Sequence, residues 1–166
     1  TPINVEGGGF TQVGASHSTP NLTTTVNNVL LVTCFGNNPS TNTWTPPTSF
    51  TERFDVNSGS GTYESSATCA ESLQATAGAT GIKTASSSDI TSSGVATLIG
   101  LWPSGGTQSV TQITLVGQSL QNGATATAFT LQNPASARAD DLLLAFIEND
   151  SNGAELGAPA GWTLVR

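Results

Sequence analysis

The apolar run Val29-Leu30-Leu31-Val32-Thr33-Cys34-Phe35 lies between two polar pairs, Asn27-Asn28 and Asn37-Asn38. Its length and its content of β-branched residues are typical of a buried β-strand. Similar short runs follow along the chain, separated about every eight to twelve residues by Gly, Asn, Pro and Ser. No segment places apolar residues at the i, i+3, i+4, i+7 spacing of an amphipathic helix. The sequence therefore predicts an all-β protein.

The expected strands are close together along the chain, which favours antiparallel pairing in a β-sandwich of the Ig-like or jelly-roll-like kind. In the first two thirds of the chain they cover residues 10–16, 22–26, 29–35, 50–56, 62–75, 81–86 and 95–102. Beyond these they cover residues 110–117, 126–132, 141–147 and 162–165. Residues 75–81 contain two glycines and are expected to form a turn between two antiparallel strands.

Part of the chain resembles another part of it. Residues 27–32 match residues 140–145 at an offset of 113, and residues 47–51 match residues 159–163 at an offset of 112. Two blocks at nearly the same spacing indicate an internal repeat, although chance similarity between apolar strands is the alternative. We therefore expect a complete β-sandwich module in residues 1–104 and an incomplete second copy in residues 105–166. An incomplete copy would leave an apolar face and strand edges for other chains to cover.

Composition limits the partners and the location of the protein. Charged residues make up 9% of the 166 residues, and the net charge is −7. A chain this acidic lacks the basic surface that binds phosphates, so we expect no nucleic-acid partner. The apolar runs are too short to span a bilayer, so we expect no membrane insertion. Abundant Thr, Ser, Asn and Gly favour an extracellular or virion surface. Methionine is absent, so Thr1 is expected to follow a processing site or to begin a fragment.

The two cysteines, Cys34 and Cys69, each lie in an expected strand. A disulfide between them would close a loop of about 35 residues and stabilise the fold by roughly 3–4 kcal/mol. The alternative is a pair of reduced cysteines that act as small core residues. The chain has no CxxC motif and only one histidine, so we expect no structural zinc site.

The residues that could support catalysis are few. His17 is the only histidine, and the chain has no GxSxG motif that would supply a serine nucleophile for it. We expect His17 in a polar loop or at a strand end. Glu64 and Glu71 lie in one expected strand, with Glu52 and Asp55 in the preceding one. A glycoside hydrolase needs two carboxyl groups about 5–9.5 Å apart across a cleft, so this activity is kept as an alternative. Acidic residues on a sheet more often form a solvated face, and we expect the chain not to be an enzyme.

Polar loops offer weaker candidates for a metal site and for modification. The richest oxygen cluster, a partial match to a calcium loop, consists of Glu148, Asp150, Asn152 and Glu155. A polar loop without metal is the default interpretation, so calcium is an alternative and no cofactor is expected. Asn21 and Asn149 begin acceptor sequences for N-glycosylation.

A sugar-binding face would need exposed flat aromatic side chains. Trp44 lies in a loop rich in Asn, Thr and Pro, and with Tyr63 it forms a candidate stacking platform. A carbohydrate-binding module with a cell-surface glycan as its partner is therefore the second functional hypothesis. The alternative is that Trp44 covers one end of the core.

The sequences LLLAF at residues 142–146 and APAGWTLV at residues 158–165 resemble a β-sandwich module of bacteriophage tail-fibre and other virion proteins and of bacterial secreted surface proteins. In the first copy, residues 44–54, 75–81 and 94–103 carry the resemblance. It implies a non-enzymatic structural or adhesive module, repeated within a longer protein and without catalytic residues. Its partners would be copies of itself or other subunits of a fibre, filament or decoration layer.

Overall fold

A computed structural model describes residues 2–38, 42–58, 65–103, 132–138, 143–146, 158 and 160–162. The regular elements of this part of the chain are strands, and every pairing between them is antiparallel. The prediction of an all-β fold is therefore confirmed. The strands are β1 (Ile3–Thr11), β2 (Ser16–Ser18), β3 (Thr23–Thr24), β4 (Val29–Asn37), β5 (Trp44–Thr45), β6 (Thr51–Asn57), β7 (Ser66–Gln74), β8 (Gly78–Ala79), β9 (Thr84–Ser87) and β10 (Gly94–Leu101).

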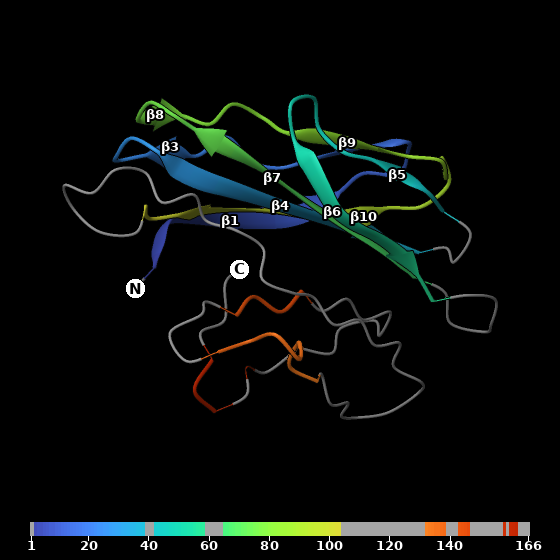
Figure 1. Ribbon diagram of the computed structural model, residues 1–166. Coiled ribbons are helices and arrows are strands. Elements are labelled where there is room, and N and C mark those ends of the chain that lie inside the picture. Colours follow the sequence, from blue (N-terminus) through green and yellow to red (C-terminus); the bar gives the residue numbers. More distant parts are fainter. Residues whose placement is uncertain are drawn as a thin grey trace.

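The largest sheet has five strands in the order β1-β10-β4-β7-β6 (Figure 1). β4 lies at its centre and is buried at eight of its nine positions. A strand that is covered on both faces needs apolar residues at consecutive positions, which explains the run that begins at Val29. The edges of this sheet are β1 and β6.

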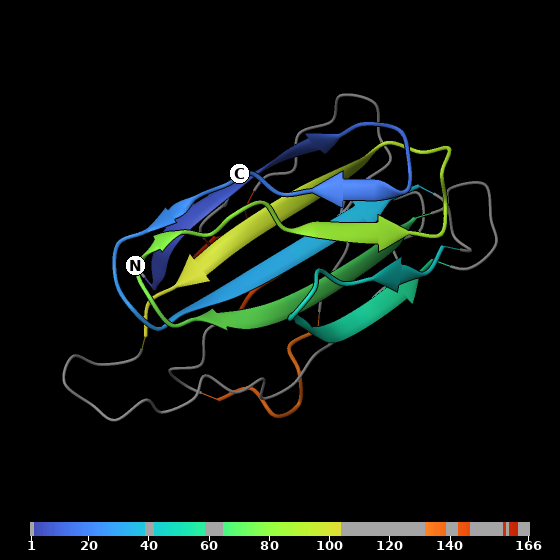
Figure 2. The ribbon, with the colours of Figure 1, turned by 90° about the horizontal axis from the view of Figure 1, so that it is seen from above.

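Two small sheets, β2-β9-β5 and β3-β8, lie over one face of the large sheet (Figure 1 and Figure 2). Side chains from both layers meet in the core. One cluster consists of Phe35, Trp44, Ala85 and Ala96. The other consists of Val29, Leu31 and Leu98, with Leu22, Val26 and Phe50 packed against it.

The opposite face of the large sheet is also covered at its centre. Successive side chains of a strand point to opposite faces, so Leu30, Cys34, Cys69 and Leu101 point away from the small sheets. All four are nevertheless buried. The described residues 132–138 and 143–146 lie on this side of the large sheet (Figure 1).

The first expected strand was placed wrongly, because β1 covers Ile3–Thr11 and not residues 10–16. Gly7, Gly8 and Gly9 lowered the strand propensity of this segment. Two of them are needed for close packing, since a Cβ at Gly7 would lie 3.0 Å from the Leu22 side chain and one at Gly8 would lie 2.8 Å from the carbonyl oxygen of Ala96. Glycine here permits two segments to approach closely.

Residues 75–81 do not join two paired strands as expected. β7 belongs to the large sheet, whereas β9 pairs with β2 and β5 in a small one. The connection therefore crosses between layers, and within it β8 pairs with β3.

The expected second module, residues 105–166, lies mostly outside the described residues, so the repeat stays a prediction. Residues 143–146, the described part of the expected strand 141–147, are not in a strand. Leu144 is exposed there, and these residues have no strand partner in the part of the chain that the structure describes. No helix in the described residues is long and apolar enough to cross a membrane.

Candidate functional site

Trp44 is buried, which corrects its assignment to an exposed stacking platform. Only 5% of its surface is accessible, and its ring centroid lies 6.1 Å from that of Phe35. Its backbone N–H donates to Asp55 and its indole N–H donates to Ser66. Asn42 and Trp44 are buried and Thr43 between them is exposed, as in a strand with one face in the core, but the local sequence Asn-Thr-Trp-Thr-Pro carries no apolar alternation that would indicate it. Tyr63, the proposed second aromatic, lies outside the described residues.

A closed network of buried polar side chains surrounds this tryptophan. The Asn42 amide donates to Asn37 and to Ser66, and Ser66 itself donates to Asn37. Asn37 donates to Ser87, and Ser87 donates back to Asn42. These bonds join β4 and β7 of the large sheet to β9 of a small one. Buried amides need such partners, so the network fixes the two layers against each other.

His17 is buried in β2, although we expected it in a polar loop or at a strand end. Its Nδ1 lies 2.5 Å from the Thr11 hydroxyl oxygen, and its ring packs edge-on against Trp44. A Cβ at Gly94 would lie 3.0 Å from the same nitrogen, so a glycine in β10 makes room for the imidazole. The short pattern of an exposed, a buried and an exposed residue in β2 is that of a strand with one face in the core.

Burial lowers the pKa of His17, because removal of the ring from water disfavours its charged form. A hydrogen bond with the Gly14 backbone and the negative charge of Asp89 act in the opposite direction. The imidazole therefore favours the neutral state in the folded protein. Its hydrogen bond with Thr11 and its contact with the Trp44 ring give His17 a role in packing.

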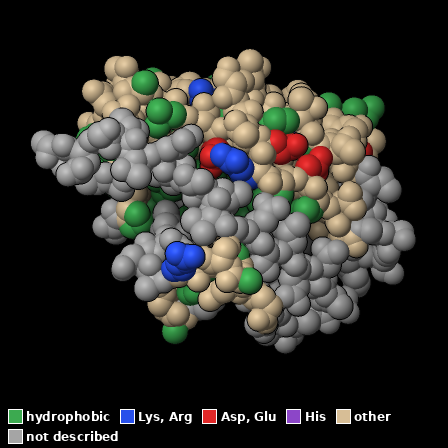
Figure 3. All heavy atoms as spheres, in the orientation of Figure 1, with side chains coloured by type: hydrophobic (Ala, Val, Ile, Leu, Met, Phe, Trp, Pro, Cys, Tyr) green, Lys and Arg blue, Asp and Glu red, His purple; other side chains and the backbone are tan. Residues whose placement is uncertain are grey.

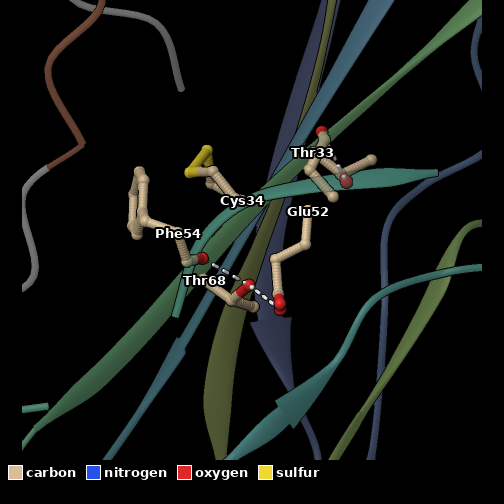
Figure 4. The surroundings of a disulfide bond; sticks show 7 residues. Thr33, Cys34, Glu52, Phe54 and Thr68 are labelled. Carbon is tan, nitrogen blue, oxygen red and sulfur yellow. Dashed lines mark hydrogen bonds between the residues drawn. A yellow bond between two sulfur atoms is a disulfide. The ribbon is translucent and has the colours of Figure 1, made fainter. Parts of the chain in front are cut away.

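Cys34 and Cys69 form a disulfide across directly opposed positions of β4 and β7. Figure 4 shows the disulfide and the Phe54 ring on one side of the sheet. Beside them on the same face, Arg53 forms an ion pair with Glu71. The bond therefore ties neighbouring strands of one sheet, with apolar and paired side chains around it.

Three of the candidate carboxylates, Glu52, Asp55 and Glu71, are bonded to other groups of the fold. Glu52 accepts a hydrogen bond from the Thr68 hydroxyl on the core side of the sheet (Figure 4). Glu71 pairs with Arg53 on the other side. Asp55 accepts the Trp44 backbone N–H. The sheet separates Glu71 from Glu52 and Asp55, whereas Glu52 and Asp55 pair with Ala70 and Thr68 and so lie on the same face. The glycoside-hydrolase alternative, which needs two carboxyl groups across one cleft, stays a prediction. Glu64 lies outside the described residues.

The candidate calcium ligands Glu148, Asp150, Asn152 and Glu155, and the acceptor Asn149, also lie outside the described residues. Among the residues that the structure describes, no group of three or more His, Cys, Asp or Glu could hold a metal ion. Asn21 is exposed, and its side-chain oxygen accepts the backbone N–H of Gly81. The amide nitrogen, which is the atom that glycosylation modifies, is not the atom that makes this bond.

No residue of the edge strand β1 was among the predicted site residues. Phe10 is 91% exposed there, and the neighbouring Gly8 and Gly9 are exposed as well. On the face that Figure 3 shows, charged side chains are few, and backbone together with uncharged, non-hydrophobic residues makes up most of the coloured surface. An exposed aromatic ring on a long edge strand is a feature of interaction surfaces.

Comparison of the chain with protein-family models, with curated proteins and with solved structures finds no match.

Proposed function

We propose that this chain is a non-enzymatic structural or adhesive β-sandwich module, which assembles with other subunits through a strand edge. The observation that carries the proposal is β1, a nine-residue edge strand with an almost fully exposed phenylalanine. Unpaired N–H and C=O groups along an edge are a template for another strand, and soluble proteins usually block them.

The use made of the polar side chains supports a structural role. The buried amides of Asn37 and Asn42 bond to each other. The carboxylates of Glu52, Glu71 and Asp55 bond to Thr68, Arg53 and the Trp44 backbone, respectively. These groups hold strands and layers together.

A location at an extracellular or virion surface forms part of the proposal. The Cys34–Cys69 disulfide is typical of proteins that mature in an oxidising compartment. The net charge of −7 with only 9% charged residues gives a largely uncharged polar surface, which suits a subunit packed among others.

Analytical ultracentrifugation and negative-stain electron microscopy of the full chain test this function. We expect species larger than the monomer, whose proportion grows with protein concentration and with salt, since salt screens the net negative charge. A chain that stays monomeric across the accessible concentration range, with no particles or filaments, would contradict the proposal.

A further inference from the structure

The two edges of the large sheet differ in how they are protected. β6 carries the charged residues Glu52, Arg53 and Asp55, and its register with β7 is interrupted by a bulge between Glu52 and Phe54. Charges and bulges are the usual means of preventing edge-to-edge pairing. The edge at β6 is therefore a poor template for another strand.

β1 lacks this protection over most of its length. From Val5 to Thr11 its pairing with β10 is regular, and Glu6 is its only charged residue. It contains neither proline nor lysine. The other described edge strands, β2, β3, β5 and β8, have two or three residues each, too few for a stable ladder. β1 is thus the long, regular and weakly charged edge of the described fold.

On the face of β1 that points away from the small sheets, Gly8, which has no side chain, lies beside the aromatic ring of Phe10. Gly8 and Phe10 point to this face because Glu6, Gly8 and Phe10 alternate with inward-facing residues. Gly8 cannot take a side chain, since a Cβ would lie 2.8 Å from the Ala96 carbonyl oxygen and 2.9 Å from the Thr97 hydroxyl. A bare backbone position therefore lies next to an exposed aromatic side chain.

We infer that a second copy of this chain pairs its own β1 antiparallel to this edge, with Gly9 opposite Gly9 at the two-fold axis. This inference rests on the proposed function and names the edge and the partner. In this register Phe10 of each copy lies opposite Gly8 of the other, and an aromatic ring placed across from an edge glycine shields its backbone. The ring and the gap belong to one strand, so the strand complements an antiparallel copy of itself.

Charge favours the same register. Pairing centred on Gly9 places each Glu6 opposite Gln12, an exposed uncharged residue just beyond the end of β1. Pairing centred on Glu6 would bring the two carboxylates face to face, which is destabilising. Pairing centred on Gly8 would set each carboxylate against the Phe10 ring. The Gly9-centred ladder avoids both arrangements.

A single added cysteine tests the register. The described residues contain no free cysteine, so Gly9→Cys adds one reactive thiol at a position where a Cβ meets nothing within 4 Å. The control is Ile82→Cys, at a side chain that is 65% exposed on another part of the fold. Across a two-fold axis the two thiols share a high effective concentration, so we expect Gly9→Cys to form a covalent dimer at least about tenfold faster than the control. Equal rates would overturn the inference.

A second variant does not depend on the new thiol. Phe10→Ser should reduce the self-association of the full chain and slow the cross-linking of Gly9→Cys, while the melting temperature changes little because the ring is exposed. Ile90→Ser, at another exposed apolar residue, is the matched control and should leave both unchanged.

The results separate this inference from the proposed function. If the unmodified chain assembles and neither Gly9→Cys nor Phe10→Ser differs from its control, the β1 pairing is wrong and assembly uses another surface. If the unmodified chain is monomeric at every concentration, both proposals fail.

Discussion

The imidazole of His17 lies edge-on to the indole of Trp44, with ring centroids 5.2 Å apart and planes inclined at 61°. The two residues come from β2 and β5, the outer strands of a small sheet, and β9 runs between them. Ala85 of β9 pairs with His17 and packs against Trp44, and as a small, fully buried residue it leaves space for the two rings. This contact joins both outer strands to one core cluster.

Replacement of Trp44 by alanine should destabilise the protein strongly. The change removes a buried indole and its hydrogen bond to Ser66, and we expect the free energy of unfolding to fall by about 3–5 kcal/mol in urea denaturation. Trp102→Ala, at a tryptophan that is 42% exposed, should lower it less. An unchanged melting temperature for Trp44→Ala would mean that the side chain is not part of the core.

Stability should decrease as the solution becomes mildly acidic. The pKa of His17 is lower in the folded protein than in the unfolded chain because of burial, so the unfolded chain binds a proton first. The free energy of unfolding should therefore fall as the pH drops below about 6.5, the pKa of histidine in the unfolded chain. Below the pKa of His17 in the folded protein, this residue should cause no further decrease. Urea unfolding at a series of pH values measures this slope.

His17→Gln is the control for the pH series. His17 is the only histidine, so the variant should lose the slope between about pH 5 and 6.5, the range above the ordinary carboxylate pKa values. Asp89 is expected to stay ionised there: desolvation raises its pKa, but hydrogen bonds with Ser92 and Thr91 outweigh this and lower it. A slope that persists in the variant would assign the effect to another group.

Loss of the Asn42 amide should leave several buried groups without partners. Its nitrogen donates to Asn37 and Ser66, and its oxygen accepts hydrogen bonds from Ser87, from Ser88 and from the Asp89 backbone. We expect Asn42→Ala to lower the free energy of unfolding by about 2–4 kcal/mol. The adjacent exposed Thr43→Ala should change it by less than about 0.5 kcal/mol, and equal effects would show that the network does not stabilise the fold.

The disulfide should contribute a measurable part of the stability. The bond joins residues 35 positions apart, and its removal in Cys34→Ala/Cys69→Ala should lower the free energy of unfolding by about 3–4 kcal/mol. A reducing agent should produce a similar loss in the natural chain and none in the double variant. A natural chain that is equally stable with and without reductant would contradict this expectation.

Two glycines should respond differently to the same substitution. A Cβ at Gly94 would lie 2.4 Å from the backbone oxygen of Gly36, and backbone in a sheet centre cannot move aside cheaply. Gly94→Ala should therefore destabilise by about 1–3 kcal/mol, as overpacking does. Gly9→Ala, which meets open space, should change the stability by no more than about 0.5 kcal/mol. Similar melting temperatures for the two variants would contradict the close approach at Gly94.

The interior strands were predictable because runs of apolar and β-branched residues indicate a buried strand. β4 and β10 begin and end within two residues of the expected ranges, since their apolar and β-branched residues have no other place to pack. β1 was misplaced because consecutive glycines read as a loop. Their role depends on the distance to Leu22 and Ala96, which the local sequence does not contain.

The surroundings of Trp44 were harder to predict for a related reason. Asparagine and serine residues such as Asn37, Asn42 and Ser87 normally indicate turns, and the segment around Trp44 was interpreted as a loop. In the folded protein they satisfy one another across two layers, a tertiary arrangement between residues up to 50 positions apart. The cysteine pair left two interpretations open in the sequence, and the register of β4 with β7 selects the disulfide.

Ile3 at the start of β1 pairs with Leu101 at the end of β10. The first and the last residue of the large sheet along the chain therefore lie side by side at one end of it. A pulling force applied between these two residues would act on one pair at a time, because the hydrogen bonds of an antiparallel ladder lie across the strands. The ladder would open like a zipper at low force. A load that arrived along the length of β1 from a paired neighbouring strand would instead be shared by the whole ladder and would be resisted in shear.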